Sequence, residues 1–266
     1  MFESFILGAV QGIAEWLPIS SEAMIILVKT NFFPSGISFS ELISFAIFLH
    51  LGTLLAVVVY YWKKISILFR QLSCYQLLDT QDKKYINFII IATAVSGILG
   101  IVLIDIVERY ESYFQNESMI NILVAVFLLI TAILLFISER NKTERLVELS
   151  TKKGIITGIF QGFAAIPGIS RSGSTVAGMA LLGIDKERAL ELSFILSIPL
   201  VLLANIVLNL DSFKTINSEN LVALFSAFIF GLITIDILLR IVRKVRFSYF
   251  VGGFAVLLII LSIMVI

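Results

Sequence analysis

Arg171 is the residue whose type and surroundings point most directly to chemistry. It lies in the segment PGISRSGST, residues 167–175, between two apolar stretches. An arginine in apolar surroundings is costly unless it pairs with an acid or an anionic ligand. A guanidinium fork, the free N–H groups of a starting helix and the positive end of its dipole together suit a phosphate. We therefore expect the neighbours of this arginine to bind a phosphate with it: Ser170, Ser172, Gly173, Ser174 and Thr175.

A second polar cluster lies near the N-terminus. Gln11 and Glu15 are four residues apart and would share one face of a helix. Carboxylates beside a bound phosphate can hold a divalent cation or steer a proton, and a nearby serine can attack phosphorus. The two clusters together give the candidates for catalysis and substrate binding, which are Gln11, Glu15, Ser20, Ser21, Glu22 and Arg171, with Glu15 as the ligand of Mg²⁺ or Ca²⁺ where a cation is used.

The same residues allow a purely structural interpretation. Arg171 and Glu15 could form a salt bridge, in which Glu15 does no more than neutralise the arginine. An ion pair alone does not need so many hydroxyls beside it. The pattern therefore favours anion binding.

Membrane helices must position these residues. The chain has 266 residues, of which 59% are apolar and 15% charged, whereas a soluble domain carries about 25% charged residues. The net charge of +1 gives no indication of nucleic-acid binding. The single cysteine, Cys74, and the single histidine, His50, exclude an intrachain disulfide, a cysteine metal cluster and a multi-histidine zinc site.

Six stretches are apolar and long enough, at about 20 residues, to cross a bilayer as helices: residues 39–62, 86–107, 117–137, 188–210, 220–242 and 247–266. His50 falls within the first, where a lone histidine is more often a hydrogen bonder between helices than a catalyst.

Two further apolar regions, residues 2–30 and 154–183, are interrupted near their middle by Pro, Gly and Ser. This is typical of a re-entrant hairpin, because non-helical backbone at that depth is tolerated only where protein or a wet cavity covers it. We therefore predict an all-α polytopic membrane protein with six full transmembrane helices, two re-entrant helical hairpins and a pocket between the two breaks.

The two interrupted regions resemble each other at a constant offset of 150 residues. Six residues recur in the same order: Gly8, Gln11, Gly12, Ala14, Ile19 and Ser20 match Gly158, Gln161, Gly162, Ala164, Ile169 and Ser170. Three full spans follow each hairpin, and an odd number of spans inverts the second copy relative to the first. We therefore predict a single membrane domain, residues 1–266, built as an inverted repeat of residues 1–138 and 154–266.

Positive charge predicts the orientation. With the segment after the first full span on the cytoplasmic side, sixteen of the 20 basic residues lie inside and only Lys29, Arg109 and Lys214 outside, as the positive-inside rule prefers. The remaining basic residue is Arg171, at the second break. The first hairpin then enters from outside and the second from the cytoplasm, with both termini outside.

Two motifs resemble those of the undecaprenyl-diphosphate phosphatase family, also called the bacitracin-resistance protein family: QGIAEWLPISS at residues 11–21 and PGISRSGST at residues 167–175. The segment HLGTLLAV, residues 50–57, is similar to that family's third recurrent stretch. The resemblance covers essentially the whole chain, and the family's paired re-entrant hairpins agree with the predicted fold. It implies hydrolysis of the terminal phosphate of a long polyprenyl diphosphate, in the cytoplasmic (plasma) membrane and with the active site facing outward.

The resemblance also implies residue roles. Gln11 and Glu15 fall on the family's acidic motif, and Ser21 falls on the serine proposed as nucleophile. Arg171 and Thr175 fall on the pair that grips the phosphate.

One position departs from the family, which usually carries a histidine three residues after that serine, where this chain has Met24. Methionine cannot shuttle a proton. Three explanations are open: Glu22 takes over the acid–base role, the enzyme relies on Glu15, a metal ion and water, or the protein moves the lipid without cleaving it.

These observations leave two further classes of function beside the phosphatase. Inverted repeats with half-helices at the midplane are transporter architecture, so a translocase (flippase) for polyprenyl-phosphate carrier lipid is the main alternative. A small-anion transporter ranks lower, because the arginine–serine segment suits phosphate. The expected partners are a polyprenyl diphosphate lipid and the bilayer, with a homodimer as a further prediction and with no nucleic acid and no organic cofactor.

Overall fold

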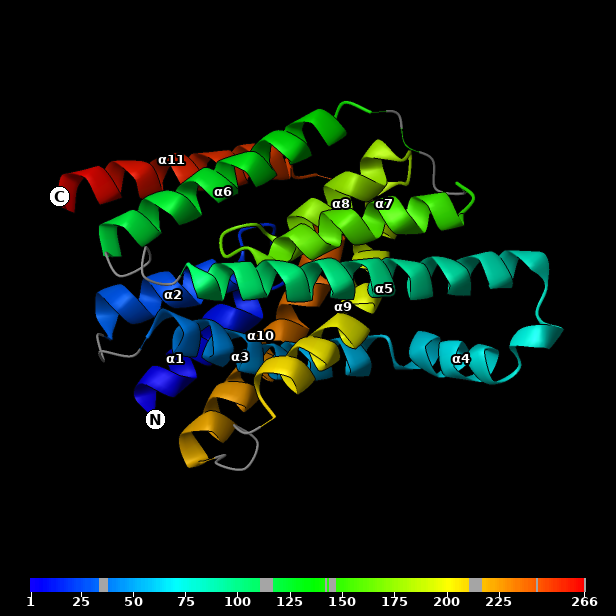
Figure 1. Cartoon of the computed structure of the whole chain (residues 1–266), viewed down its shortest axis with the longest axis horizontal. Coiled ribbons are helices and arrows are strands. Elements are labelled where there is room, and N and C mark those ends of the chain that lie inside the picture. Colours follow the sequence, from blue (N-terminus) through cyan, green and yellow to red (C-terminus); the bar gives the residue numbers. More distant parts are fainter. Residues whose placement is uncertain are drawn as a thin grey trace.

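The computed structural model describes residues 1–33, 38–110, 117–141, 143, 147–210, 217–242 and 244–265, and over these residues all regular structure is helical (Figure 1). In chain order the α-helices are α1 (Phe2–Ala14), α2 (Ser21–Phe32), α3 (Phe39–Tyr60), α4 (Trp62–Ser73), α5 (Thr80–Arg109), α6 (Glu117–Ser138), α7 (Thr151–Gly162), α8 (Arg171–Leu181), α9 (Lys186–Leu208), α10 (Ser218–Ile241) and α11 (Phe247–Val265). Two short 3₁₀ helices, η1 (Tyr75–Leu77) and η3 (Phe163–Ala165), precede α5 and α8. Helices α6 and α11 pack along each other on one side of the bundle (Figure 1).

Five helices have the length and apolar composition needed to cross a membrane. They are α3, α9 and α10 in full, with Thr80–Val107 of α5 and Ile120–Ser138 of α6. They confirm a multi-pass membrane protein and five of the predicted spans. The sixth, residues 247–266, coincides with α11, but its described apolar part, Phe247–Ile260, is shorter than a span, and residue 266 lies outside the described residues.

The segment between the first two spans contains structure that the apolar pattern does not predict. It forms α4, a short helix with many charged and polar residues. Ile65 is the only residue of this helix that is buried. Helix α5 begins at Thr80, six residues before the predicted start at residue 86, because a helix can continue into polar sequence beyond the membrane. Apolar length therefore marks the membrane crossing and not the whole helix.

The two interrupted regions fold as pairs of short helices, α1 with α2 and α7 with α8. A serine caps the second helix of each pair: the Ser20 hydroxyl accepts a hydrogen bond from the N–H of Ala23, and the Ser170 hydroxyl accepts one from Gly173. Ser20 has φ +58°, a conformation that L-residues adopt at an energetic cost. Both helix breaks lie where the sequence predicts them, whereas their re-entrant course through a membrane stays a prediction.

Glycines let the first helix of each pair pack closely on a long helix. Helix α1 packs against α10, and α7 packs against α5. A Cβ added to Gly8 would clash with the carbonyl oxygen of Ala223, and one added to Gly158 would clash with that of Ala92. Small residues allow helix backbones to approach this closely. This explains the recurrence of glycine at these positions, while the inverted repeat and its boundaries stay predictions.

The orientation in the membrane also stays a prediction. Lys142, Arg145, Lys214 and Arg243, which enter the positive-charge count, lie outside the described residues.

The close packing of α1 predicts a matched pair of stability effects. Gly12→Ala should lower the free energy of unfolding by about 1–3 kcal/mol, the usual cost of overpacking. The added Cβ would lie 2.6 Å from the Gly231 nitrogen and 2.7 Å from the Ala227 carbonyl oxygen. Gly253→Ala is the control, since a Cβ there meets nothing within 4 Å. Thermal unfolding in detergent measures both, and equal Tm values would contradict the close approach.

Candidate active site

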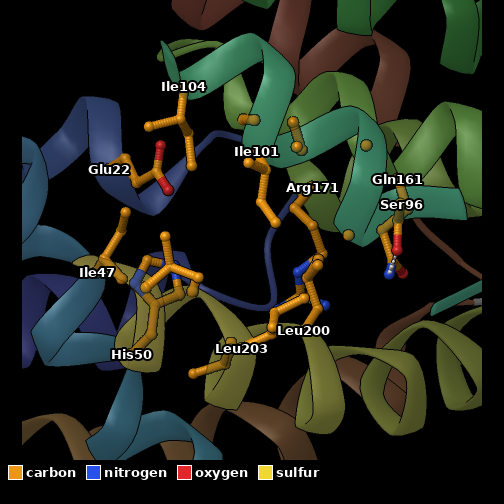
Figure 2. A pocket seen from close by; sticks show the side chains of 18 of the residues that line it. Glu22, Ile47, His50, Ser96, Ile101, Ile104, Gln161, Arg171, Leu200 and Leu203 are labelled. Carbon is orange, nitrogen blue, oxygen red and sulfur yellow. Dashed lines mark hydrogen bonds between the residues drawn. The ribbon is translucent and has the colours of Figure 1, made fainter. Parts of the chain in front are cut away.

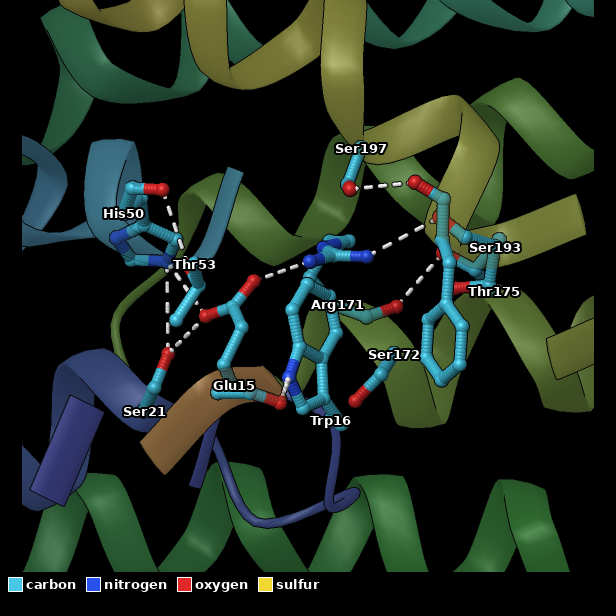
Figure 3. Close-up of polar contacts among 12 residues, drawn as sticks. Glu15, Trp16, Ser21, His50, Thr53, Arg171, Ser172, Thr175, Ser193 and Ser197 are labelled. Atoms are coloured by element: carbon cyan, nitrogen blue, oxygen red, sulfur yellow. Dashed lines mark hydrogen bonds and ion pairs between the residues drawn. The ribbon is translucent and has the colours of Figure 1, made fainter. Parts of the chain in front are cut away.

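Glu15 lies at the centre of a buried polar cluster between the two helix breaks (Figure 3). Its Oε1 pairs with the guanidinium of Arg171. Its Oε2 accepts hydrogen bonds from the Ser21 hydroxyl at 2.7 Å and from the Gln11 amide at 2.8 Å, and lies 3.0 Å from Nε2 of His50. One carboxylate therefore joins residues from α1, α2, α3 and α8.

Arg171 is the first residue of α8, and its side chain reaches the first break. One guanidinium nitrogen pairs with Glu15 and the other donates to the Ser193 carbonyl of α9 at 3.2 Å. The guanidinium carbon lies 5.9 Å from the centre of the Trp16 ring, whose Nε1 donates to the Gly231 carbonyl at 3.0 Å. Only 13% of the Arg171 side chain is exposed. The arginine is thus held by groups from both halves of the chain.

Two helix N-termini face a small pocket beside this ion pair. Helix α2 begins at Ser21 and α8 begins at Arg171, and their N-cap residues Ser20 and Ser170 line the pocket. Helix starts present unpaired N–H groups and a positive dipole end, which attract anions. The pocket has a cavity volume of about 20 Å³, and its lining residues are Glu15, Ser20, Ser21, Glu22, His50, Ala164, Ile169, Ser170 and Arg171. It combines a cation, anion-binding helix ends and a hydroxyl, as a phosphate site requires.

The other hydroxyls predicted to bind a phosphate donate to the main chain. Ser172 donates to the Leu17 carbonyl of the first break at 3.0 Å. Ser174 and Thr175 donate to the Arg171 carbonyl at 3.2 Å and 2.6 Å. These three residues do not belong to the lining of the small pocket. They fix the turn that carries Arg171, and their role as direct ligands stays a prediction.

Gly173 brings the two breaks into contact. A Cβ at this position would lie 2.7 Å from the Thr131 methyl group and 3.0 Å from Cβ of Pro18. Helix α8 therefore passes this close to the first break only because no side chain intervenes. The structure gives Gly173 a packing role, and its predicted contact with substrate stays a prediction.

Gln11 and Glu22 relate to the pocket in different ways. Gln11 is fully buried, donates to Glu15 and lies behind the lining residues. Glu22 lines both this pocket and the larger one beside it, and the described residues make no hydrogen bond or ion pair with its carboxylate. Gln11 thus supports the site from behind, whereas Glu22 faces the open space.

A larger and mostly apolar pocket, here called the trough, opens beside the small one (Figure 2). Its cavity volume is about 100 Å³. Glu22, His50 and Arg171 lie at one end, and isoleucine, leucine and valine side chains of α3, α5 and α9 line most of the rest. Ser96 and Gln161 are further polar residues of the lining (Figure 2). Gly97 and Gly100 of α5 also line it, which leaves room beside that helix. A trough of this composition suits a hydrocarbon chain.

His50 is the site residue that could not be predicted from the sequence. It lies within α3, with Nε2 3.0 Å from Glu15 and 3.4 Å from the Ser21 hydroxyl. Its Nδ1 lies 2.7 Å from the Ala46 carbonyl oxygen. The only sequence signal is its place in the recurrent segment at residues 50–57. The contact itself depends on how α3 packs against α1 and α2, which no local spacing reveals.

The described residues do not fit a cation held by Glu15. Oε1 is paired with Arg171, and Oε2 is surrounded by Ser21, Gln11 and His50. An ion would have to displace these groups. No group of three or more His, Cys, Asp or Glu side chains that could hold a metal ion occurs among the described residues. The need for Mg²⁺ or Ca²⁺ therefore stays a prediction, which activity with and without a chelator tests.

The burial of the ion pair predicts a non-additive effect on stability. Glu15→Gln should lower the free energy of unfolding by about 3–5 kcal/mol, because it leaves Arg171 buried without its counter-charge. The double variant Glu15→Gln with Arg171→Met should regain part of that loss, since no uncompensated charge remains. Both should be inactive. Tm values of Glu15→Gln, Arg171→Met and the double variant check this cycle. A loss of stability in the double variant equal to the sum of the two single losses would contradict a coupled buried pair.

The comparisons with known proteins agree with this geometry. The family model described as bacitracin resistance protein BacA matches residues 4–263. A protein of Methanococcoides burtonii named undecaprenyl-diphosphatase is 40% identical over 259 residues, which cover 96% of each chain. Proteins of the same name from Methanosphaera stadtmanae and Treponema denticola are 35% and 37% identical and cover 99% and 94% of this chain, and 98% and 92% of their own. A match of this extent, on a chain whose two breaks meet in one buried polar cluster, shows that the protein belongs to the bacitracin resistance protein (BacA) family.

Proposed function

We propose that the protein hydrolyses undecaprenyl diphosphate to undecaprenyl phosphate and inorganic phosphate. The observation that carries this proposal is the junction of two pockets. A small polar pocket, centred on Arg171 and Glu15, opens beside an apolar trough that shares four of its lining residues: Glu22, His50, Ala164 and Arg171. A lipid with a phosphorylated head needs both kinds of surface in contact. The name of the relatives supports the same substrate.

Arg171 binds the diphosphate. A guanidinium has five N–H donors in a fixed fork, and the described contacts use its two terminal nitrogens for Glu15 and the Ser193 carbonyl. The substrate can therefore take further donors from the same group while Glu15 keeps the arginine in place. The N-termini of α2 and α8 add backbone donors, and such preorganised donors stabilise the charge that develops at phosphorus.

Ser21 attacks the terminal phosphorus. Its hydroxyl lies in the small pocket and donates to Glu15 at 2.7 Å, so its oxygen is held on the side of the carboxylate opposite Arg171. Glu15 orients both the Ser21 hydroxyl and the Arg171 guanidinium. Gln11 holds the carboxylate from behind. Glu15 is therefore a positioning residue for both Ser21 and Arg171.

The trough receives the prenyl tail. It is bounded by α3, α5 and α9, and its lining side chains include Ile101 and Val207, which are 45% and 50% exposed on the surface of the helix bundle. The trough therefore reaches the surface that lipid would cover. A tail can enter sideways from the bilayer while the head reaches Arg171.

Within the membrane we propose six spans, two re-entrant hairpins formed by α1–α2 and α7–α8, and an inverted repeat of residues 1–138 and 154–266. The corresponding packing of the first helix of each pair, α1 on α10 and α7 on α5, supports this arrangement. The distribution of the basic residues supports the proposed orientation of the spans, and the family resemblance is the ground for placing the protein in the plasma membrane with the pocket open outward. A homodimer remains a prediction.

Carrier-lipid translocation without hydrolysis is the weaker reading. The relatives carry the name of a phosphatase, and a nucleophile with an adjacent anion site has no use in translocation alone.

Loss of the guanidinium should abolish hydrolysis. Arg171→Ala should lower kcat/KM for undecaprenyl diphosphate by on the order of 100-fold or more, as for the loss of a donor at a developing charge. Arg70→Ala, on the exposed face of α4, is the control and should keep full activity. Phosphate release in detergent or liposomes measures both, with and without chelator. Activity of Arg171→Ala near that of the control would overturn the proposed function.

A side chain that fills part of the trough should weaken binding of the long prenyl tail and leave binding of the diphosphate head unchanged. Gly100→Leu should raise KM for undecaprenyl diphosphate about tenfold, a usual effect of pocket shape on an apolar group. A short-chain prenyl diphosphate should be unaffected. A Cβ at Gly100 meets only Ala165, at 3.9 Å, so the added side chain has room to extend into the trough. Gly253→Leu on α11 is the control, and equal effects on both chain lengths would contradict this path for the tail.

A further inference from the structure

We propose that His50 is a catalytic residue that accepts the proton of the Ser21 hydroxyl during attack on phosphorus. This proposal rests on the hydrolysis proposed above. Nε2 of His50 lies 3.4 Å from the Ser21 oxygen, and both atoms face the same pocket. Histidine is the side chain best suited to take up and return a proton near neutral pH.

The other ring nitrogen fixes which atom can take the proton. Nδ1 lies 2.7 Å from the Ala46 carbonyl oxygen, and a carbonyl can only accept a hydrogen bond. Nδ1 must therefore carry the hydrogen. Nε2 lies 3.0 Å from the Glu15 carboxylate and 3.4 Å from the Ser21 oxygen (Figure 3). A carboxylate only accepts, so the contact with Glu15 is the one that the protonated ring makes, whereas the neutral ring leaves Nε2 free to accept the Ser21 proton. The backbone of α3 thus orients the ring with its basic atom toward the nucleophile.

The two carboxylates of the pocket are less suited to this step. Glu15 pairs with Arg171 and accepts from Gln11 and Ser21, so its negative charge is already stabilised by donors and it is a weak base. Glu22 lines the pocket, but among the described contacts none joins its carboxylate to Ser21. His50 remains as the base within reach of the hydroxyl.

The charged groups that face His50 support both protonation states of its ring. Glu15 follows the last residue of α1, Glu22 lies on α2 and Arg171 begins α8. In the described part of the chain, these are the ionisable groups that line the two pockets together with His50. Glu15, 3.0 Å from Nε2, can accept a hydrogen bond from the imidazolium once it forms. The carboxylate thus stabilises the product of the proton transfer.

The step balances without another reactant. The Ser21 proton moves to Nε2, the serine oxygen bonds to the terminal phosphorus, and the bond from that phosphorus to the bridging oxygen breaks. Undecaprenyl phosphate leaves with the bonding electron pair. Water then attacks the phosphoserine, and the serine oxygen leaves and takes its proton back from His50. One proton of the water stays on the released phosphate, and the other goes to solvent.

A glutamine in place of the histidine separates proton transfer from hydrogen bonding. The amide of His50→Gln can still bond to Glu15 but cannot take up a proton. It should lower kcat by on the order of 100-fold or more, with KM within about threefold of the original. Thr53→Ser, one turn along α3 and bonded to the His50 carbonyl, is the control and should keep full activity. A kcat for His50→Gln within about threefold of the control would overturn the proposal.

The chain contains a single histidine, which allows a second test that needs no variant. Protein with an untagged sequence and ¹⁵N-labelled histidine gives one imidazole to follow by NMR as the pH changes. Activity should fall as the pH is lowered through the range in which His50 becomes protonated, because the protonated ring cannot accept the serine proton. The acid limb of kcat/KM should therefore coincide with the NMR titration, and a clear separation of the two would overturn the proposal.

The outcomes distinguish the two proposals. Absence of phosphate release by the unaltered protein would overturn the proposed function. Normal release by the unaltered protein, together with an active His50→Gln variant, would overturn the role of His50 alone.

Discussion

The buried ion pair between Glu15 and Arg171 is the interaction on which the rest of the structure depends. Charges in apolar surroundings are costly, and each residue is tolerable only because the other is present. The two residues come from the two helix breaks, so their pairing requires the breaks to meet. The same carboxylate also collects Ser21, Gln11 and His50. One electrostatic requirement thus fixes the relative positions of α1, α2, α3 and α8.

Helix breaks make this cluster useful as well as stable. A continuous helix uses its own N–H groups, whereas the starts of α2 and α8 leave theirs available beside the guanidinium. Ser20 holds a positive φ at this point, and Gly173 allows α8 to pass close to Pro18. Local strain and close packing are therefore concentrated where anion-binding groups converge. The apolar trough opens next to them.

Much of this arrangement could be predicted from the sequence. Apolar length predicts five of the observed spans, and interruptions by proline, glycine and serine predict both breaks. The cost of a buried arginine predicts that Arg171 pairs with an acid or an anionic ligand, and in the structure it pairs with Glu15. These features follow from local composition and from the energetics of single residues.

The remainder depends on packing between distant segments. His50 reaches Glu15 only because α3 lies against α1 and α2, and the spacing of the residues around it does not indicate that contact. Ser172, Ser174 and Thr175 have the composition of a phosphate loop, but their hydroxyls satisfy backbone carbonyls. Helix α4 has too many charged residues for an apolar pattern to detect. Hydrogen-bond direction and long-range packing are the two properties that residue spacing does not encode.

The central claim is that a phosphorylated lipid head binds between Arg171 and Ser21, with its tail in the trough. The most direct measurement is an experimental structure with a non-hydrolysable, methylene-bridged polyprenyl diphosphate. We expect the terminal phosphate within hydrogen-bonding distance of the Arg171 guanidinium, facing the Ser21 hydroxyl, and the first prenyl units between α5 and α9. A diphosphate bound away from Arg171, with the Glu15 pair undisturbed, would contradict it.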